Sequence, residues 1–266
     1  METIRLTRSI GKKMDGLPRK GHGRTRLASR WKNDGYHIRL YYEKAGDGEP
    51  LILLHGNGED GTYFKHQMEY FSKDYRVIAI DTRGHGKSPR GEKPFTIRQF
   101  AEDLNGFMEE QGMEKAHLLG FSDGGNIALA FALRYPGKVE SLILNGANLC
   151  PAGVKPSVQI PIVLGYKITS FFGRFHHRSR QKAEMLGLMT TQPDLSPRQL
   201  KEVKARTLVI VGENDMIKDS HSVLICESLP NARLVRIKGD HFIAAKNPEE
   251  FNRAVSRFLR NCDSIV

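Results

Sequence analysis

The feature that most constrains this chain is a regular alternation of short apolar runs with longer amphipathic segments. The apolar runs are short enough to be strands buried on both faces of a sheet; they are residues 51–54, 77–80, 117–119, 142–144, 208–211 and 234–237. The segments between them have helical periodicity at 63–71, 95–110, 126–134, 220–228 and 248–259. This alternation is typical of βα units on a mostly parallel sheet, so the sequence predicts an α/β fold.

One interruption in this rhythm predicts a separate structural unit. About fifty residues separate Cys150 from Arg206, whereas connections in α/β units usually span two to six residues. The interval contains helical patterns near 163–175 and 197–203. We therefore expect residues 150–206 to form a cap or lid inserted into a core of residues 26–149 and 207–266.

Charge is concentrated in two segments of the chain. Residues 1–34 and residues 151–206 each contain ten Lys or Arg and three acidic residues, within a total formal charge of +11. Residues 1–25 lack hydrophobic periodicity, and we expect them to be a disordered basic extension. Clustered cations could also bind nucleic acid, but no reader motif accompanies them, so no specific nucleic acid is expected.

Other sequence features favour a protein of the cytoplasm. The 266-residue chain has no run of about 18 apolar residues and no apolar N-terminal block. Its three cysteines, Cys150, Cys226 and Cys262, are too few and too scattered for a disulfide framework, and we expect free thiols. No CxxC or HExxH spacing is present, so neither a metal nor a cofactor is expected.

The strongest local signal for chemistry is the sequence GFSDGG, from Gly120 to Gly125. It follows an apolar strand and opens a predicted helix, which is the context of a GxSxG nucleophile elbow. Gly120 and Gly124 would give clearance to a sharp turn that holds Ser122 in a strained conformation. The alternative is a glycine-rich turn that only packs a helix on the sheet.

A serine nucleophile needs a base and a group that orients the base. Asp215 follows the strand at 207–211 through the turn GEND, and His241 follows the strand at 233–238 in GDHF. Alone, any one of the ten histidines could be structural, but His241 comes directly after the last predicted strand. The sequence HGNG after the first apolar run predicts an oxyanion hole formed by the backbone amides of Asn57 and Asp123.

Together, HGNG, DTRGHGKS (Asp81 to Ser88), GFSDGG, GEND and GDHF resemble the α/β-hydrolase superfamily over roughly residues 30–262. The resemblance implies a mostly parallel sheet flanked by helices, with a short helical cap inserted after the sixth strand. It also implies a Ser122, Asp215, His241 triad in the order of that family. In the family, the segment that matches Asp81 to Ser88 is a structural turn. One departure is Asp240, where many members have glycine before the histidine.

The run from Gly120 to Leu149 is similar to valacyclovir-hydrolase-like and bacterial esterase members of this superfamily. In the valacyclovir-hydrolase-like branch, the residue matching Asp123 can attract the amino group of an amino-acid ester. Alternatively, Asp123 contributes only its amide. Apolar cap residues, among them Phe171 and Phe172, either contact substrate or dock the cap on the core. The basic cluster beside them is either a solvated face or a weak attractor of anionic substrates or membrane surfaces.

These motifs predict a serine hydrolase that cleaves a carboxylic ester, or a related small acyl compound, through an acyl-enzyme. A C–C bond hydrolase, a lactonase or a small-amide aminopeptidase would use the same triad, because the fold alone does not choose the chemistry. An alternative of another class is a non-catalytic ligand receptor on the same scaffold. We expect a monomer or homodimer with a small-molecule acyl substrate.

Overall fold

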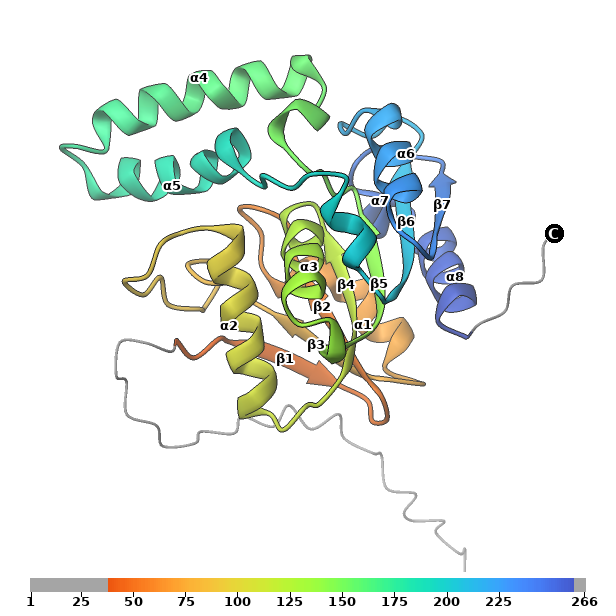
Figure 1. Cartoon of the computed structure of the whole chain (residues 1–266). Coiled ribbons are helices and arrows are strands. Elements are labelled where there is room, and N and C mark those ends of the chain that lie inside the picture. Colours follow the sequence, from red (N-terminus) through yellow and green to blue (C-terminus); the bar gives the residue numbers. More distant parts are fainter. Residues whose placement is uncertain (1–37, 261–266) are drawn as a thin grey trace, which may run out of the picture.

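Residues 38–260 are described by a computed structural model, and their central feature is a seven-stranded sheet (Figure 1). The strands lie in the order β1-β3-β2-β4-β5-β6-β7, and all neighbours are parallel except β1 and β3. Their bounds are β1 Tyr42–Ala45, β2 Pro50–Leu54, β3 Arg76–Ile80, β4 Ala116–Phe121, β5 Val139–Asn145, β6 Arg206–Gly212 and β7 Ala232–Ile237. All six predicted strands are confirmed.

The sheet is covered on both faces, as its apolar strands require. Successive side chains of a strand point to opposite faces, and β2 shows the result: Leu51 and Leu53 belong to one core cluster, whereas Ile52 and Leu54 belong to the other. Every one of these four side chains is buried. The sheet therefore separates two hydrophobic cores, one on each face.

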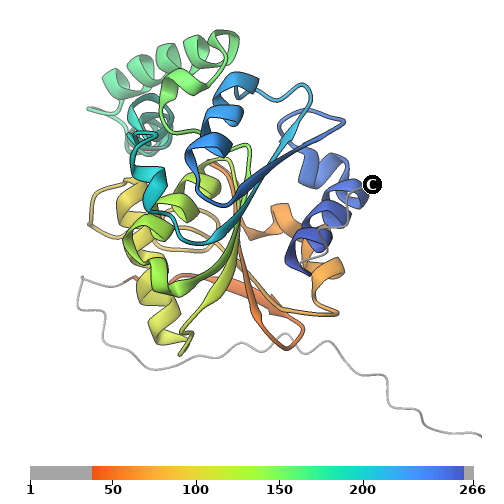
Figure 2. The same cartoon turned by 45° about the vertical axis from the view of Figure 1, so that its right-hand side comes forward.

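Helices form the two outer layers (Figure 2). One layer is α1 Lys65–Phe71, α7 Ile243–Lys246 and α8 Pro248–Leu259, and the other is α2 Ile97–Glu110, α3 Asp123–Arg134 and α6 Asp219–Ser228. The helix α2 begins where the side chain of Thr96 accepts a hydrogen bond from the amide of Gln99, which satisfies a backbone donor that a helix start leaves free. The predicted helices of the core are thus confirmed within a few residues.

The segment between β5 and β6 forms a helical hairpin on the carboxyl edge of the sheet (Figure 1). Its helices are α4 Pro156–Phe172 and α5 His177–Thr191, with 3-10 turns at Pro151–Gly153 and Gln199–Glu202. The turn at Gln199–Glu202 replaces the second predicted helix, and α5 was not predicted. The sequence predicts that the cap follows the sixth strand, and this is corrected. Within residues 38–260 the cap follows the fifth strand, β5, because β1 is the one strand that precedes β2 in this range.

Two expectations fall wholly or partly outside the described range. The basic extension of residues 1–25 lies outside it, as does Cys262. Cys150 and Cys226 are free thiols, as predicted. None of the helices in residues 38–260 combines the length and the apolarity that crossing a bilayer requires.

Candidate active site

The predicted triad and oxyanion residues all follow parallel strands, at the same edge of the sheet. Asp215 is hydrogen-bonded to His241 and Asn57 to Asp123, whereas no hydrogen bond joins Ser122 to Nε2 of His241 in residues 38–260. Asn57 follows β2, Ser122 follows β4, Asp215 follows β6 and His241 follows β7. The strands that follow β2 in the sequence are placed on opposite sides of it: β3 lies next to β2 on one side and β4 on the other. Such a switch point at the carboxyl edge is where open α/β sheets bind ligands.

Ser122 has the strained backbone that the elbow predicts. Its φ is 53° and its ψ is −119°, and within residues 38–260 it is the only non-glycine residue with positive φ. The turn is tight, because a Cβ on Gly124 would lie 1.9 Å from the carbonyl oxygen of Leu54 and one on Gly120 would lie 2.2 Å from that of Gly124. The predicted clearance at Gly120 and Gly124 is therefore confirmed. Such strain is stored mainly at functional sites.

Asp215 and His241 form a buried, hydrogen-bonded pair. The Oδ1 atom of Asp215 lies 2.7 Å from Nδ1 of His241, and both side chains are less than 5% exposed. The same Oδ1 accepts a hydrogen bond from the amide of Ile217 at 2.9 Å. The carboxylate therefore fixes the orientation of the imidazole and favours the tautomer with a proton on Nδ1.

The second ring nitrogen of His241 is left free to accept a proton. Nε2 is buried and forms no hydrogen bond with any residue of the described part. The imidazole packs against Phe121, with ring centroids 4.8 Å apart, and Phe121 in turn stacks on Tyr63 at 4.4 Å. This aromatic wall excludes water from one side of the imidazole.

Two glycines that the sequence did not single out make room for the histidine loop. A Cβ on Gly146, whose φ is 62°, would lie 2.6 Å from Cε1 of His241. A Cβ on Gly212 would lie 2.1 Å from the carbonyl oxygen of Asp240. A glycine directly after a predicted strand at the carboxyl edge is the signal that could have identified Gly146.

Asp240, the departure from the family pattern, has a local structural role. Its Oδ1 accepts a hydrogen bond from the amide of Phe242 at 2.9 Å, and its Oδ2 pairs with Lys246. Gly239 before it has a φ of 145°, which glycine adopts without steric cost. The turn that follows β7 is therefore closed by Asp240, and His241 points inward.

The side chains of Asn57 and Asp123 are joined across the mouth of the site. Asn57 Nδ2 donates to Asp123 Oδ2 at 2.9 Å and to the carbonyl oxygen of Met185 on α5 at 2.8 Å. Asn126 Nδ2 donates to the other carboxylate oxygen of Asp123 at 3.1 Å. Burial raises the pKa of Asp123, while the two amides oppose that shift. The carboxylate thus holds Asn57, whose backbone is a predicted oxyanion donor.

His55 and the segment from Asp81 have structural partners. Burial lowers the pKa of His55 to about 4, so the ring is neutral; its Nδ1 lies 2.7 Å from the carbonyl oxygen of Gly56, and its Nε2 accepts from the amide of Thr82. The carboxylate of Asp81 accepts from the amides of Gly61 and Lys87. These bonds fix the loops that follow β2 and β3.

Glu59 is a titratable group near the site that sequence reasoning missed. Its Oε2 accepts from the amide of Gly56 at 3.3 Å. Burial raises its pKa to about 7, and the nearby His241 partly offsets that effect. A glutamate in a loop between a strand and a helix is normally exposed to solvent, so the sequence gives no sign that Glu59 is partly buried.

The hairpin is fastened to the core above the site. Arg90 pairs with Glu184 of α5 through two bonds, at 2.8 and 2.6 Å. A cavity of about 530 Å³ lies at this junction, and its lining includes Phe95, Tyr166 and Leu188. Phe171 and Phe172, expected to contact substrate, are 57% and 49% exposed at the end of α4. Their contact with substrate stays a prediction.

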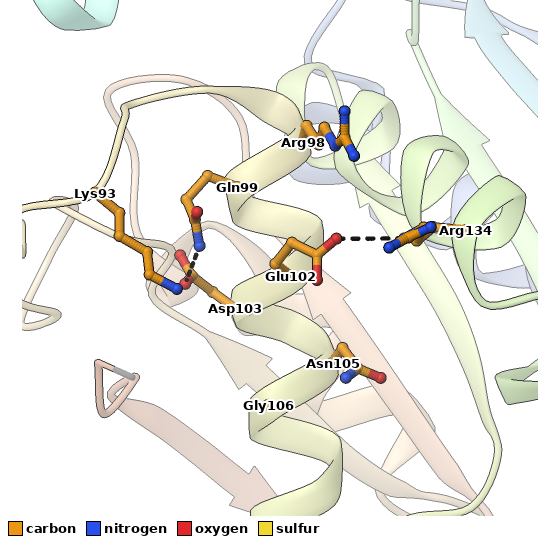
Figure 3. Close-up of a pocket in the computed structure, with 8 residues that line it drawn as sticks. All are labelled: Lys93, Arg98, Gln99, Glu102, Asp103, Asn105, Gly106 and Arg134. Atoms are coloured by element: carbon orange, nitrogen blue, oxygen red, sulfur yellow. Dashed lines mark hydrogen bonds and ion pairs between the residues drawn. The ribbon is translucent and has the colours of Figure 1, made fainter. Parts of the chain in front are cut away.

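A second cavity, of about 410 Å³, lies along α2 and holds none of the predicted site residues (Figure 3). Two interactions join residues of its lining: Glu102 lies 3.5 Å from Arg134, and Gln99 donates to Asp103. Asp103 also accepts two bonds from the buried Arg83. These interactions make the cavity part of the support beneath the loop that follows β3.

The root of the hairpin is bonded to the loop that carries Asp215. The amide of Lys155 donates to the carbonyl oxygen of Met216 at 2.8 Å, and the amide of Lys218 donates to that of Gly153 at 2.9 Å. Val154 and Ile217 form an isolated β-bridge between these bonds. The cap and the acid of the predicted triad thus share a backbone connection.

Known proteins of similar sequence and structure are hydrolases. 2-Hydroxy-6-oxo-6-phenylhexa-2,4-dienoate hydrolase from Comamonas testosteroni is 30% identical over 263 residues, covering 83% of this chain and 91% of the relative. The structure of a meta-cleavage product hydrolase from Pseudomonas fluorescens IP01 has a TM-score of 0.69 and 25% identity, covering 85% of this chain and 96% of that one. A thermophilic esterase from Thermogutta terrifontis has a TM-score of 0.68 and 26% identity, covering 84% and 94%.

A family profile leads to the same classification as these relatives. The profile described as alpha/beta hydrolase fold matches residues 49–166, which include β2 to β5 and the elbow at Ser122. The sheet order, the flanking helices and the nearly full-length similarity to hydrolases agree with it. The chain therefore belongs to the α/β-hydrolase family and is a hydrolase.

Proposed function

We propose that this hydrolase cleaves a carboxylic ester, or a related small acyl compound, with Ser122 as nucleophile, His241 as base and Asp215 as the group that orients the base. The observation that carries the proposal is the buried Asp215–His241 bond of 2.7 Å, at the sheet edge where Ser122 occupies a strained elbow. Nε2 of His241, which has no hydrogen-bond partner in residues 38–260, is the atom that would take the proton of Ser122.

In the reaction, Ser122 Oγ attacks the acyl carbonyl while His241 accepts its proton. The backbone amides of Asn57 and Asp123 stabilise the oxyanion of the tetrahedral intermediate. His241 then protonates the leaving group and later activates the water that hydrolyses the acyl-enzyme. The hydrogen bonds that hold Asn57 to Asp123 and to α5 support this assignment, because an oxyanion donor must be fixed before the charge develops.

Asp123 has a supporting role in this proposal. Its two carboxylate oxygens already accept bonds from Asn57 and Asn126, and burial raises its pKa. An amino group of a substrate would have to compete with both amides for this carboxylate. Its raised pKa also makes the charged form less favourable. The contacts therefore favour a part in holding the oxyanion loop over capture of an amino-acid ester.

The hairpin of α4 and α5 acts as the cap in this proposal, over the domain bounds 150–206 predicted from the sequence. Within the enzyme, Phe95, Tyr166 and Leu188 at the cavity between hairpin and core are candidates for substrate contact, together with the predicted Phe171 and Phe172. The basic residues of the cap would attract anionic substrates or membrane surfaces. A cytoplasmic location and a monomeric or homodimeric state complete the proposal.

The test is a panel of p-nitrophenyl esters, amino-acid esters and lactones run with the native chain and Ser122→Ala. We expect the native chain to turn over a short p-nitrophenyl ester, and we expect Ser122→Ala to lower kcat/KM at least about 10⁴-fold. A fluorophosphonate probe should label the native chain and not the variant. Full turnover by Ser122→Ala would overturn the triad, and a native chain that neither reacts with the probe nor hydrolyses the panel would favour a ligand receptor.

A second candidate is cleavage of a C–C bond, favoured by the relative from Comamonas testosteroni, whose name gives a 2-hydroxy-6-oxo-dienoate as its substrate. The same triad and oxyanion hole would serve it. Loss of absorbance of such a dienoate, faster than hydrolysis of any ester in the panel, would establish this candidate. The ester candidate predicts the reverse order of rates.

A further inference from the structure

The outer face of α4 gathers most of the exposed large hydrophobic side chains of residues 38–260. Nine such side chains are exposed in this range, and six of them lie on α4 or in the turn after it. The six, which we call the α4 stripe, are Ile160, Leu164, Ile168, Phe171, Phe172 and Phe175. Ile160, Leu164, Ile168 and Phe171 follow one another at intervals of four, four and three residues, which places them on one side of the helix, and Phe172 and Phe175 extend the stripe at its C-terminal end.

The helix α4 is apolar on its outer face as well as on the side that packs toward α5. Side chains of its inner face bond or pack toward α5: Gln159 donates to the carbonyl oxygen of Met189, and Tyr166 lies 3.3 Å from the Cβ position of Gly187. The outer face carries Ile160, 67% exposed, and Leu164, 59% exposed. No residue of α4 is buried. A surface helix of a water-soluble domain usually turns its polar side outward, so an apolar outer face marks an interaction surface.

The charge around the stripe selects the partner. Residues 155–191 contain six Lys or Arg and a single acidic residue, Glu184, which is paired with Arg90. The exposed basic residues include Lys167 within the stripe and Arg174, Arg178, Arg180 and Lys182 beyond it. A second copy packed on this face by two-fold symmetry would bring two such positive clusters together. Anionic lipid headgroups would instead neutralise them.

The placement of the hairpin makes the stripe accessible to a flat surface. Both views show the hairpin projecting beyond the carboxyl edge of the sheet, with α4 on the outside and α5 between it and the core (Figures 1 and 2). An extended planar partner can therefore meet α4 along its length. An apolar helical face edged by Lys and Arg is the usual composition of a helix that lies in a lipid interface.

We propose that the α4 stripe and its flanking basic residues dock this protein on an anionic lipid surface. The apolar side chains enter the boundary between headgroups and acyl chains, and the basic residues pair with lipid phosphates. The cavity between the hairpin and the core, lined by Tyr166 and Leu188 beneath α4, then lies next to the membrane. This arrangement would favour acyl substrates that partition into lipid.

The experiment measures cosedimentation of the full chain with vesicles made of equal parts phosphatidylcholine and phosphatidylglycerol. The variant Ile160→Gln/Leu164→Gln removes two members of the stripe and leaves every charge, including those of residues 1–34. The matched control is Tyr70→Gln/Leu224→Gln, which replaces two side chains that are each 38% exposed on other helices. All variants carry Ser122→Ala as well, so that no lipid is hydrolysed.

We expect the stripe variant to bind the mixed vesicles at least tenfold more weakly than the parent, and the control to bind as the parent does. Binding should fall with salt and be weaker to pure phosphatidylcholine. Equal binding by the stripe variant, or no binding by the parent, would overturn the proposal. So would light scattering that shows a dimeric parent and a monomeric stripe variant, because the face would then join two copies. If the native chain, which retains Ser122, hydrolyses no ester, that result counts against the proposed function and leaves the docking proposal intact.

Discussion

At the scale of single residues, the site depends as much on side chains that are absent as on those that react. Gly120, Gly124 and Gly146 each occupy positions where a Cβ would overlap a neighbour. The first two are visible in the sequence because they belong to a motif of fixed spacing. Gly146 is not, because its neighbour His241 lies 95 positions further along the chain and only the fold brings them together.

Gly146→Ala should therefore disable the enzyme without unfolding it. The new methyl group would displace the His241 ring, and small misplacements of a catalytic group cost about 10²-fold in rate. Gly112→Ala is a matched control, because Gly112 has the same φ of 62° but no atom within 4 Å of its Cβ position. Both variants should lose about 1 kcal/mol of stability from backbone strain. Equal kcat/KM for the two would contradict the role of Gly146.

His55 should make stability depend on acid. Its folded-state pKa of about 4 lies below the ordinary value of 6.5, because burial disfavours the charged ring. The unfolded chain therefore binds more protons between these values, so stability is full above about pH 6.5 and falls as the pH drops toward 4. The loss attributable to this residue is about 3 kcal/mol. Urea unfolding at several pH values should show a shallower acid slope for His55→Gln, and an unchanged slope would refute this.

At the scale of secondary structure, the accuracy of a prediction depends on how much of the element is buried. Five of the six predicted strands, β2 to β6, are largely buried on both faces, so their runs are almost wholly apolar; β7, at the opposite edge of the sheet from β1, is partly covered and has the exposed Arg236 within its run. The edge strand β1 reads YEKA and is only partly covered. Likewise α5 was not predicted, because it packs on a helix and a cavity rather than on the sheet, and its first turns are basic. Among its residues only Leu188 is buried.

The contact between Arg90 and Glu184 should hold α5 over the site. Its side chains are 29% and 31% exposed, so Glu184→Gln should lower global stability by less than about 1 kcal/mol. The local effect should be larger: faster amide hydrogen exchange in α5 and a higher KM with little change in kcat. Glu140→Gln, which breaks the exposed Lys115–Glu140 pair on the core, is the control. Unchanged exchange in α5 would show that other contacts hold the cap.

At the scale of the whole molecule, a sheet with a hydrophobic core on each face carries a hairpin whose two helices bury a single residue, Leu188. The fold class and the sheet were predictable, as was the place of the proposed triad residues after β4, β6 and β7, because short apolar strands and glycine turns leave local marks in the sequence. The orientation of the hairpin was not, since apolar residues at helical spacing can face either a core or a partner. Exposure of Ile160 and Leu164 is a property of the assembled fold.

Removal of the hairpin should leave the core folded. Gln159 bonds the carbonyl of Met189 at 3.0 Å, so a short Gly-Ser linker can replace residues 160–187 without straining the ends. Because no residue of α4 is buried and Leu188 is kept, the melting temperature should fall by only a few degrees. Activity on p-nitrophenyl esters should show a lower kcat as well as a higher KM, because the deletion also removes the carbonyl of Met185 that holds Asn57. Cooperative unfolding lost on deletion would show that the hairpin belongs to the core.

The backbone bridge between Val154 and Ile217 gives the hairpin a mechanical property. With 17 residues, α4 is about 25 Å long, and it begins two positions after Val154. A displacement of the base of α4 would therefore be passed through this bridge to the loop that carries Asp215, so a load on the cap should disturb the orientation of the His241 imidazole.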